Sequence, residues 1–173
     1  MNKSKYILPM LALSLIISLS IAMAETQVIS LKPERVDALS GEIVELQLIY
    51  NVLGEVQKTT GIGLRIHYNS KSISKLEPVN MYGEEFVGQH FKPTDDLHDF
   101  DNNPLTDKYI CIAWMSILGS WPKLLDLPAN LGIITLQLKP DNTYDETQIN
   151  ITSTSAALGC KFKGQSAVID IYQ

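Results

Sequence analysis

The chain has 173 residues with a formal net charge of −5 at pH 7, and 45% of the residues are hydrophobic. That length suits one globular domain with a sizeable core. The acidic balance argues against nucleic acid and anionic membranes as partners, because both carry negative charge themselves.

Residues 1–24 are predicted to be a signal peptide that forms a helix and is cleaved after export. Two lysines precede the apolar run Tyr6–Ile21, and Ala22-Met23-Ala24 supplies the small residues of a cleavage site. The alternative is an uncleaved membrane anchor, for which the run is short against a span of roughly 20 residues. Cleavage leaves one domain, residues 25–173, in which no apolar run is long enough to cross a membrane. We therefore expect a periplasmic or extracellular protein.

The mature chain is predicted to be all-β. Stretches of alternating apolar and polar residues are typical of half-buried strands, and polar turns separate them. The piece Ile73–Val87 is left open between a short helix and a turn. Many short strands at regular spacing favour a β-sandwich. The alternating stretches are Glu42–Val52, Gly61–Asn69, Tyr109–Met115, Leu131–Pro140, Thr147–Thr154 and Ala167–Ile171.

A long acidic loop, Phe91–Lys108, interrupts this pattern. Asp99, Asp101 and Asn103 stand at alternating positions, and Asp107 follows. Carboxylate and amide oxygens are the ligands that calcium prefers, so these four residues form a candidate calcium site. The loop lacks the turn glycine and the bidentate glutamate of an EF-hand. The alternative is a solvated loop whose side chains cap its own backbone.

Two cysteines, Cys111 and Cys160, lie in the mature part. In an oxidising compartment they are expected to form a disulfide, and two buried free thiols are the alternative. His90 and His98 flank the acidic stretch and are candidate ligands of a transition metal, although their spacing follows no ligand rule. His67 lies on the polar side of its predicted strand and is expected to be exposed.

Aromatic side chains are the candidates for stacking on a sugar ring. Trp121 stands in a turn beside Pro122, where an exposed ring could contact a ligand. Phe100 and Tyr82 lie in the irregular middle of the chain and complete the candidate ligand site. Trp114 shares its side of the strand with apolar residues and is assigned to the core. The alternative for Trp121 is a packing lid over the edge of the sandwich.

The sequence offers no convincing catalytic constellation. Glycosidases need two carboxylates on either side of one bond, whereas Glu84 and Glu85 are adjacent. The chain has no G-x-S-x-G motif, and cysteines expected to be bridged cannot act as nucleophiles. We therefore expect no enzymatic activity, and a glycan-acting enzyme is the least favoured hypothesis.

Four segments resemble cohesin modules, a β-sandwich group related to some carbohydrate-binding modules. The resemblance implies a jelly-roll-like sandwich of about nine strands and a non-catalytic binding role. Cohesins bind a dockerin, usually inside a multi-module scaffold. The segments are Val28–Leu31 leading through Ser40-Gly41-Glu42 to Tyr50, then Gly61–Val79, then Tyr109–Trp114 running to Ser120-Trp121-Pro122, and finally Leu127–Pro140.

The leading hypothesis is an exported, non-catalytic binding module. Its partner would be a polysaccharide or a protein, dockerin-like proteins included, recognised through strand faces and the Phe91–Lys108 loop. The alternative is a structural or envelope-associated protein with no small ligand. No cofactor is expected apart from the hypothetical calcium ion.

Overall fold

The structure, a computed structural model, describes residues 25–55, 58–82, 87–116, 118–122 and 125–173. Within these residues it contains eleven strands and no helix. The strands are β1 (Thr26–Lys32), β2 (Arg35–Leu39), β3 (Ile43–Leu53), β4 (Gly61–Tyr68), β5 (Ile73–Val79), β6 (Val87–Asp95), β7 (Lys108–Met115), β8 (Ala129–Leu138), β9 (Glu146–Ser155), β10 (Lys161–Gln165) and β11 (Ala167–Tyr172).

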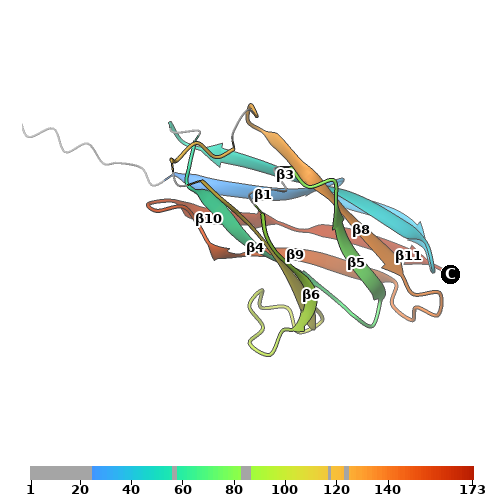
Figure 1. The fold of residues 1–173 in the computed structure, drawn as a ribbon. Coiled ribbons are helices and arrows are strands. Elements are labelled where there is room, and N and C mark those ends of the chain that lie inside the picture. Colours follow the sequence, from blue (N-terminus) through green and yellow to red (C-terminus); the bar gives the residue numbers. More distant parts are fainter. Residues whose placement is uncertain (1–24, 56–57, 83–86, 117, 123–124) are drawn as a thin grey trace, which may run out of the picture.

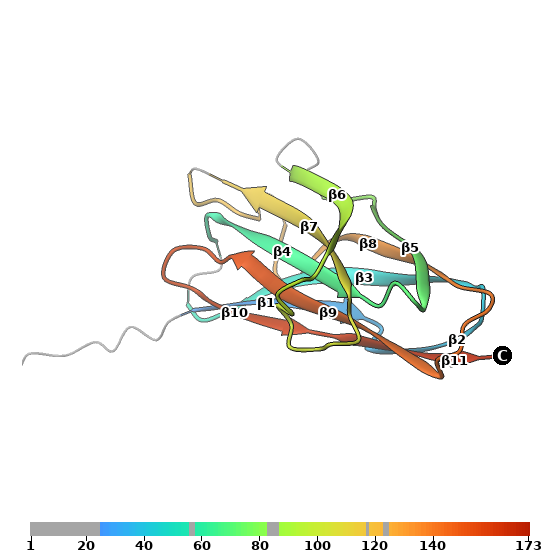
Figure 2. The same cartoon turned by 90° about the horizontal axis from the view of Figure 1, so that it is seen from below.

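The strands form two sheets that pack face to face (Figures 1 and 2). One sheet has five strands in the order β10-β1-β3-β8-β5, and the other has six in the order β2-β11-β9-β4-β7-β6. The predicted all-β, jelly-roll-like sandwich is confirmed. The structure has more strands than the nine expected, because short edge strands such as β2 and β10 carry too few residues to show an alternating pattern.

In both sheets, a parallel pair of strands joins the N-terminal part of the domain to its C-terminal part. Strand β1 pairs in parallel with β10, and β2 pairs in parallel with β11. The chain passes from one sheet to the other between β1 and β2, at residues 33–34. Both sheets therefore depend on contacts between the N-terminal and C-terminal parts of the chain.

The core lies between the sheets and follows the alternation seen in the sequence. In β3, Val44, Leu46, Leu48 and Tyr50 are buried, whereas the residues between them are exposed or half-buried. Burying each aliphatic side chain of this kind contributes roughly 1.5–3 kcal/mol. Further fully buried residues come from the other long strands, among them Leu64, Ile66, Ile110, Ile112, Ile134, Leu136, Ile149 and Ile169.

Two parts of the sequence prediction need correction. Ile73–Val79 is the edge strand β5 rather than a short helix, with Ile73 and Leu76 buried against β8. A register shift in β5 breaks the strict alternation, which hid the strand. The first part of the predicted acidic loop belongs to β6, so the loop itself is residues 96–107, here called the acidic loop.

The predicted Cys111–Cys160 disulfide is wrong for this structure, in which both cysteines are free. Cys111 lies in β7, inside the six-stranded sheet, and is paired with Arg65. Cys160 precedes β10 in the other sheet and contacts Glu25. Burial raises the pKa of both thiols. The predicted signal peptide lies outside the described residues, and among those that are described no helix could span a membrane.

Candidate functional site

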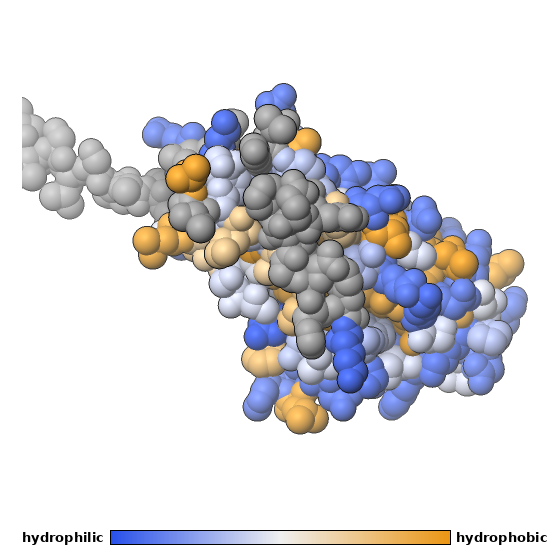
Figure 3. All heavy atoms as spheres, viewed as in Figure 1, coloured by the Kyte–Doolittle hydropathy of each residue, from blue (hydrophilic) through white to orange (hydrophobic). Residues whose placement is uncertain are grey.

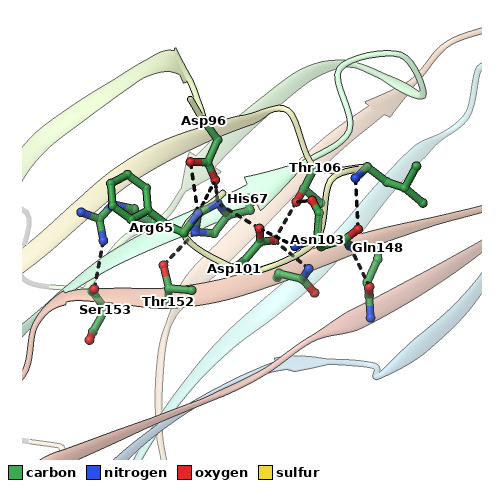
Figure 4. A network of polar contacts seen from close by, with 12 residues as sticks. Arg65, His67, Asp96, Asp101, Asn103, Thr106, Gln148, Thr152 and Ser153 are labelled. Atoms are coloured by element: carbon green, nitrogen blue, oxygen red, sulfur yellow. Dashed lines mark hydrogen bonds and ion pairs between the residues drawn. The ribbon is translucent and has the colours of Figure 1, made fainter. Parts of the chain in front are cut away.

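The acidic loop lies over the outer face of the six-stranded sheet. That face is formed in part by β4 and β9, where Arg65 is paired with Thr152 and His67 with Asn150. Alternate residues of these strands, such as Ile66 and Ile151, point into the core, so the polar side chains point outward toward the loop. Pairing of β4 with β9 therefore places four polar side chains side by side beneath the loop (Figure 4).

His67 is the centre of a buried polar cluster. Its Nδ1 lies 2.8 Å from Asp96 Oδ2, and its Nε2 lies 2.8 Å from Thr152 Oγ1. The side chains of His67 and Asp96 have no exposed surface. Burial lowers the pKa of His67, against the opposing charges of Asp101 and Asp96. The imidazole is therefore neutral at pH 7.

Asp101 is a second buried carboxylate beside this histidine. Its side chain is 2% exposed, and Oδ1 lies 4.0 Å from His67 Nδ1. Its Oδ2 accepts hydrogen bonds from Thr106 Oγ1 at 2.7 Å and from Asn150 Nδ2 at 2.8 Å. These bonds compensate part of the cost of removing a carboxylate from water, and they fasten the acidic loop to β9.

Two further side chains attach the acidic loop to neighbouring segments. Asn103 Nδ2 donates to Gln148 Oε1 at 3.1 Å. Asp107 accepts from both the backbone N and the Oγ of Ser70, each at 2.6 Å. Burial favours a higher pKa for Asp107, but the hydrogen bonds from Ser70 outweigh it and hold the pKa below its ordinary value.

The four residues of the predicted calcium site take part in separate contacts in the structure. Asp101 is in the buried cluster, whereas Asn103 and Asp107 are engaged with Gln148 and Ser70. Asp99 is exposed and has a positive φ of 50°. Calcium binding by this set stays a prediction.

Another group of possible metal ligands comes together instead. Donor atoms of His67, Asp96 and Asp101 lie within 4.8 Å of one another. The expectation that His67 is exposed is wrong, because the loop covers the outer face of its strand. Its position opposite polar residues of β9 depends on strand register, which alternation within one strand does not reveal. His98, one of the two histidines considered for a transition metal, is not part of this group, and the side chain of His90 lies outside the described part of the chain.

Phe100, one of the candidate ligand-binding residues, stacks on the guanidinium of Arg65. The Arg65 Cζ atom lies 3.9 Å from the centre of the Phe100 ring, and Arg65 Nη1 donates to the carbonyl of Ser153 at 3.0 Å. The ring of Phe100 also contacts Tyr109 and His98 edge-on. Phe100 keeps 38% of its surface exposed, so it covers the arginine and still offers one edge to solvent.

A polar groove of about 450 Å³ runs between the acidic loop and β9. Amide, hydroxyl and carboxylate groups dominate its walls, and these can donate and accept hydrogen bonds. Its lining includes Asp101, Asn103 and Thr106 from the loop, together with Gln148, Asn150 and Thr152 from β9.

Trp121 is buried, so the prediction of an exposed ring in a turn is wrong. Only 3% of Trp121 is exposed, and its ring packs against those of Tyr50, Tyr82 and Trp114. Backbone hydrogen bonds in both directions between Thr59 and Trp121, 2.8 and 2.9 Å long, draw the turn onto the core. The lid alternative is therefore the correct one, and Trp114 is in the core as predicted.

A second buried polar network lies near the N-terminal end of the domain. Gln27 Nε2 lies within hydrogen-bond distance of Tyr50 Oη at 2.9 Å, Thr59 Oγ1 at 3.1 Å and the Gly61 carbonyl at 2.9 Å. Its Oε1 accepts from the backbone N of Ala157 at 2.7 Å. Burial raises the pKa of Tyr50 in this network. Each contact joins chain segments far apart in sequence, which is typical of a structural role.

The outer face of the five-stranded sheet differs from that of the other sheet, because no described loop covers its centre. Figure 3 shows apolar and hydrophilic residues interspersed in the region of β5 and β8. On β3, Ile43 is 59% exposed and Ile49 is half-buried. The remaining residues of this open face include Glu45, Gln47, Lys75, Glu77, Ile133, Thr135 and Gln137.

Comparison with solved structures shows a known fold. A matched chain from the Coh-OlpA–Doc918 cohesin–dockerin complex of Clostridium thermocellum aligns with a TM-score of 0.54 and 14% identity, covering 85% of this chain and 99% of that one. The chain has the fold of a cohesin module. A chain from a CaDoc0917–CaCohA2 complex aligns with a TM-score of 0.50 and 17% identity, covering 84% of this chain and 99% of that one. No family model and no curated protein matches the sequence.

Proposed function

We propose that the chain is an exported binding module that recognises a protein partner through the open face of its five-stranded sheet. The cohesin fold supports a protein partner, since the matched Coh-OlpA–Doc918 structure is named as a cohesin–dockerin complex. Dockerin-like proteins are therefore the first partners to test.

The contrast between the two sheets is the observation that carries the choice of surface. The acidic loop covers part of the six-stranded sheet and uses its buried polar groups for its own attachment. The centre of the five-stranded sheet is open, and Ile133 and Thr135 are half-buried there among charged neighbours such as Glu77. A mixture of apolar and polar side chains is the usual composition of a non-obligate protein interface.

The test introduces a charge at the centre of this face. Thr135→Arg places a long cation between β3 and β5 without touching the core, and we expect it to abolish binding to a dockerin panel that the wild-type protein binds. Thr154→Arg is the matched control, since Thr154 is an exposed strand threonine of the other sheet. Surface plasmon resonance provides the measurement. Equal binding by wild type and Thr135→Arg would place the interface elsewhere.

A polysaccharide partner is the second candidate, and the polar groove is the observation that favours it. Side-chain amides such as those of Asn103, Gln148 and Asn150 can pair with sugar hydroxyls. A glycan array compares wild type with Gln148→Ala and with Thr135→Arg. Glycan binding that Gln148→Ala weakens and Thr135→Arg leaves unchanged would support the groove. Failure of both the dockerin and the glycan tests would leave the structural, ligand-free role.

A further inference from the structure

Thr152, His67 and Asp96 form a continuous hydrogen-bonded chain on the outer face of the six-stranded sheet. The hydroxyl oxygen of Thr152 lies 2.8 Å from His67 Nε2, and His67 Nδ1 lies 2.8 Å from Asp96 Oδ2. A hydroxyl, an imidazole and a carboxylate in this order are the arrangement by which proteins activate an alcohol as a nucleophile. Strand pairing and the acidic loop bring them together from positions 85 and 29 residues apart.

The direction of these hydrogen bonds follows from the charge state of His67. A neutral ring carries one proton, and Nδ1 faces a carboxylate oxygen of Asp96 at 2.8 Å, so the proton belongs on Nδ1. Nε2 is then an acceptor and receives the hydroxyl proton of Thr152. This is the tautomer that a general base requires. The groups that face His67 are Arg65, Asp96, Asp101 and the ring of Tyr109.

The three groups differ in their access to solvent. His67 and Asp96 have no exposed side-chain surface. Thr152 is half-buried and lines the polar groove of about 450 Å³. A small molecule or an extended side chain in the groove could therefore reach Thr152, whereas the base and its carboxylate partner are shielded from water.

Arg65 supplies a positive charge beside the hydroxyl. It is the residue directly opposite Thr152 across the β4–β9 pair. Its guanidinium is held by the Ser153 carbonyl and by the ring of Phe100. A fixed cation at this place favours negative charge that develops on a carbonyl oxygen under attack.

We propose that Thr152 is an acyl acceptor that takes the acyl group of an activated ester or thioester bound in the groove. The Thr152 oxygen forms a bond to the acyl carbon while its proton passes to His67 Nε2. The bond from the acyl carbon to the alcohol or thiol breaks, and the leaving group departs with that proton. The product is an ester of Thr152, and no oxidant or metal takes part in the step.

Thr154 is a natural comparison for this reaction. It lies on the same strand two residues further along, on the same side, and is exposed. Thr154 has no histidine within hydrogen-bond reach among the described contacts. Any difference in acylation between the two threonines therefore reports the effect of His67 rather than the reactivity of an exposed threonine.

The test uses 4-nitrophenyl acetate on the full folded protein, followed by peptide mapping by mass spectrometry. We expect one acetyl group on Thr152, formed about 10²–10⁴ times faster than on Thr154, which is the range that a positioned general base provides. Thr152→Ser should retain the reaction, and Thr152→Val should lose it while the protein stays folded. Equal acetylation of Thr152 and Thr154 in the wild-type protein would overturn the proposal.

Dependence on pH separates a positioning role of Asp96 from a merely structural one. The rate of Thr152 acetylation should rise as His67 loses its proton and become constant above its pKa. Asp96→Asn should lower this plateau and move the midpoint to lower pH, because the carboxylate that favours the protonated ring is gone. If Asp96→Asn stays folded and leaves both plateau and midpoint unchanged, the hydrogen-bonded chain does not activate Thr152.

This inference is independent of the proposed protein-binding face. The groove and Thr152 belong to the six-stranded sheet, and the open face belongs to the five-stranded sheet. Thr135→Arg should leave acetylation of Thr152 unchanged, and Thr152→Val should leave dockerin binding unchanged. Each proposal can therefore fail without the other.

Discussion

His67 shows how one buried side chain ties together distant parts of this protein. Its two ring nitrogens contact Asp96 in the acidic loop and Thr152 in β9. The side chain is fully buried, and this burial disfavours the protonated ring more than the carboxylates of Asp101 and Asp96 favour it. The loop position and the charge state of the histidine are therefore coupled.

The lowered pKa of His67 predicts a loss of stability in mild acid. Because the folded protein binds the proton less tightly than the unfolded chain, the unfolded state carries more protons below the ordinary pKa of 6.5. The contribution of His67 to the stability of the fold is present above that pH and is lost as the pH falls toward the pKa of His67 in the folded protein. Urea unfolding at about pH 5 and about pH 7.5 measures it.

The matched variant for this prediction is His67→Gln, which keeps polar contacts and does not titrate. We expect the wild-type protein to lose more stability than His67→Gln over the same interval. Asp107 does not interfere, because its pKa is below 3.8 and its own contribution is lost only in stronger acid. Equal losses in both proteins would show that His67 is not responsible.

At the scale of elements, Gln27 fastens β1 to three other segments. Its side chain is fully buried and contacts Tyr50 in β3, Gly61 at the start of β4 and Ala157 after β9. These contacts hold the loops at the N-terminal end of the sandwich. Each polar group that loses such a hydrogen bond and stays buried lowers the free energy of unfolding by roughly 1–3 kcal/mol.

Gln27→Leu is therefore expected to destabilise the fold by about 2–4 kcal/mol, since more than one buried partner is left without a hydrogen bond. Gln47→Leu is the control, because Gln47 is an exposed glutamine on the neighbouring strand β3. Chemical denaturation with tryptophan fluorescence follows the transition through Trp114 and Trp121. A change for Gln27→Leu no larger than that for Gln47→Leu would contradict this account.

The acidic loop is the element on which the calcium hypothesis can be decided. Binding to the folded state raises the melting temperature, so calcium chloride should raise it and a chelator should reverse the effect. Asp99→Asn and Asp101→Asn then locate the ion. Loss of the effect in both supports the predicted ligand set, and loss only in Asp101→Asn places the ion beside His67 and Asp96. No shift with calcium would end the hypothesis.

For the whole molecule, the position of the two cysteines decides how the fold is held together. Both cysteines are free: Cys111 lies in β7 of the six-stranded sheet, and Cys160 directly precedes β10 of the five-stranded sheet. Stability must then come from the core between the sheets and from the parallel pairs β1–β10 and β2–β11. A bridge would have added roughly 3–4 kcal/mol by restricting the unfolded chain.

Thiol titration of the denatured, unreduced protein should therefore find both cysteines free. The melting temperature should be the same with and without a reducing agent. Cys111→Ser with Cys160→Ser provides the reference, since that protein cannot form the bridge. A titration without free thiols, together with a melting temperature that falls on reduction, would restore the predicted disulfide.

The sequence by itself determined the strands and most of the core. Alternation in Glu42–Val52 and Gly61–Asn69 indicates which side of each strand faces the other sheet. The alternating pattern can be recognised from residues one or two positions apart. Where alternation breaks, as in β5 with its register shift, the prediction failed. The cohesin resemblance, which rests on the order of such segments, was confirmed for the fold.

Only the tertiary structure decided the site. His67, Asp96 and Thr152 meet because β4 pairs with β9 in one register and the acidic loop folds back over both. In the sequence His67 is one more polar residue of an alternating strand, and Trp121 is one more residue of a turn. Burial of each depends on contacts with residues far along the chain, and a local pattern contains no information about those contacts.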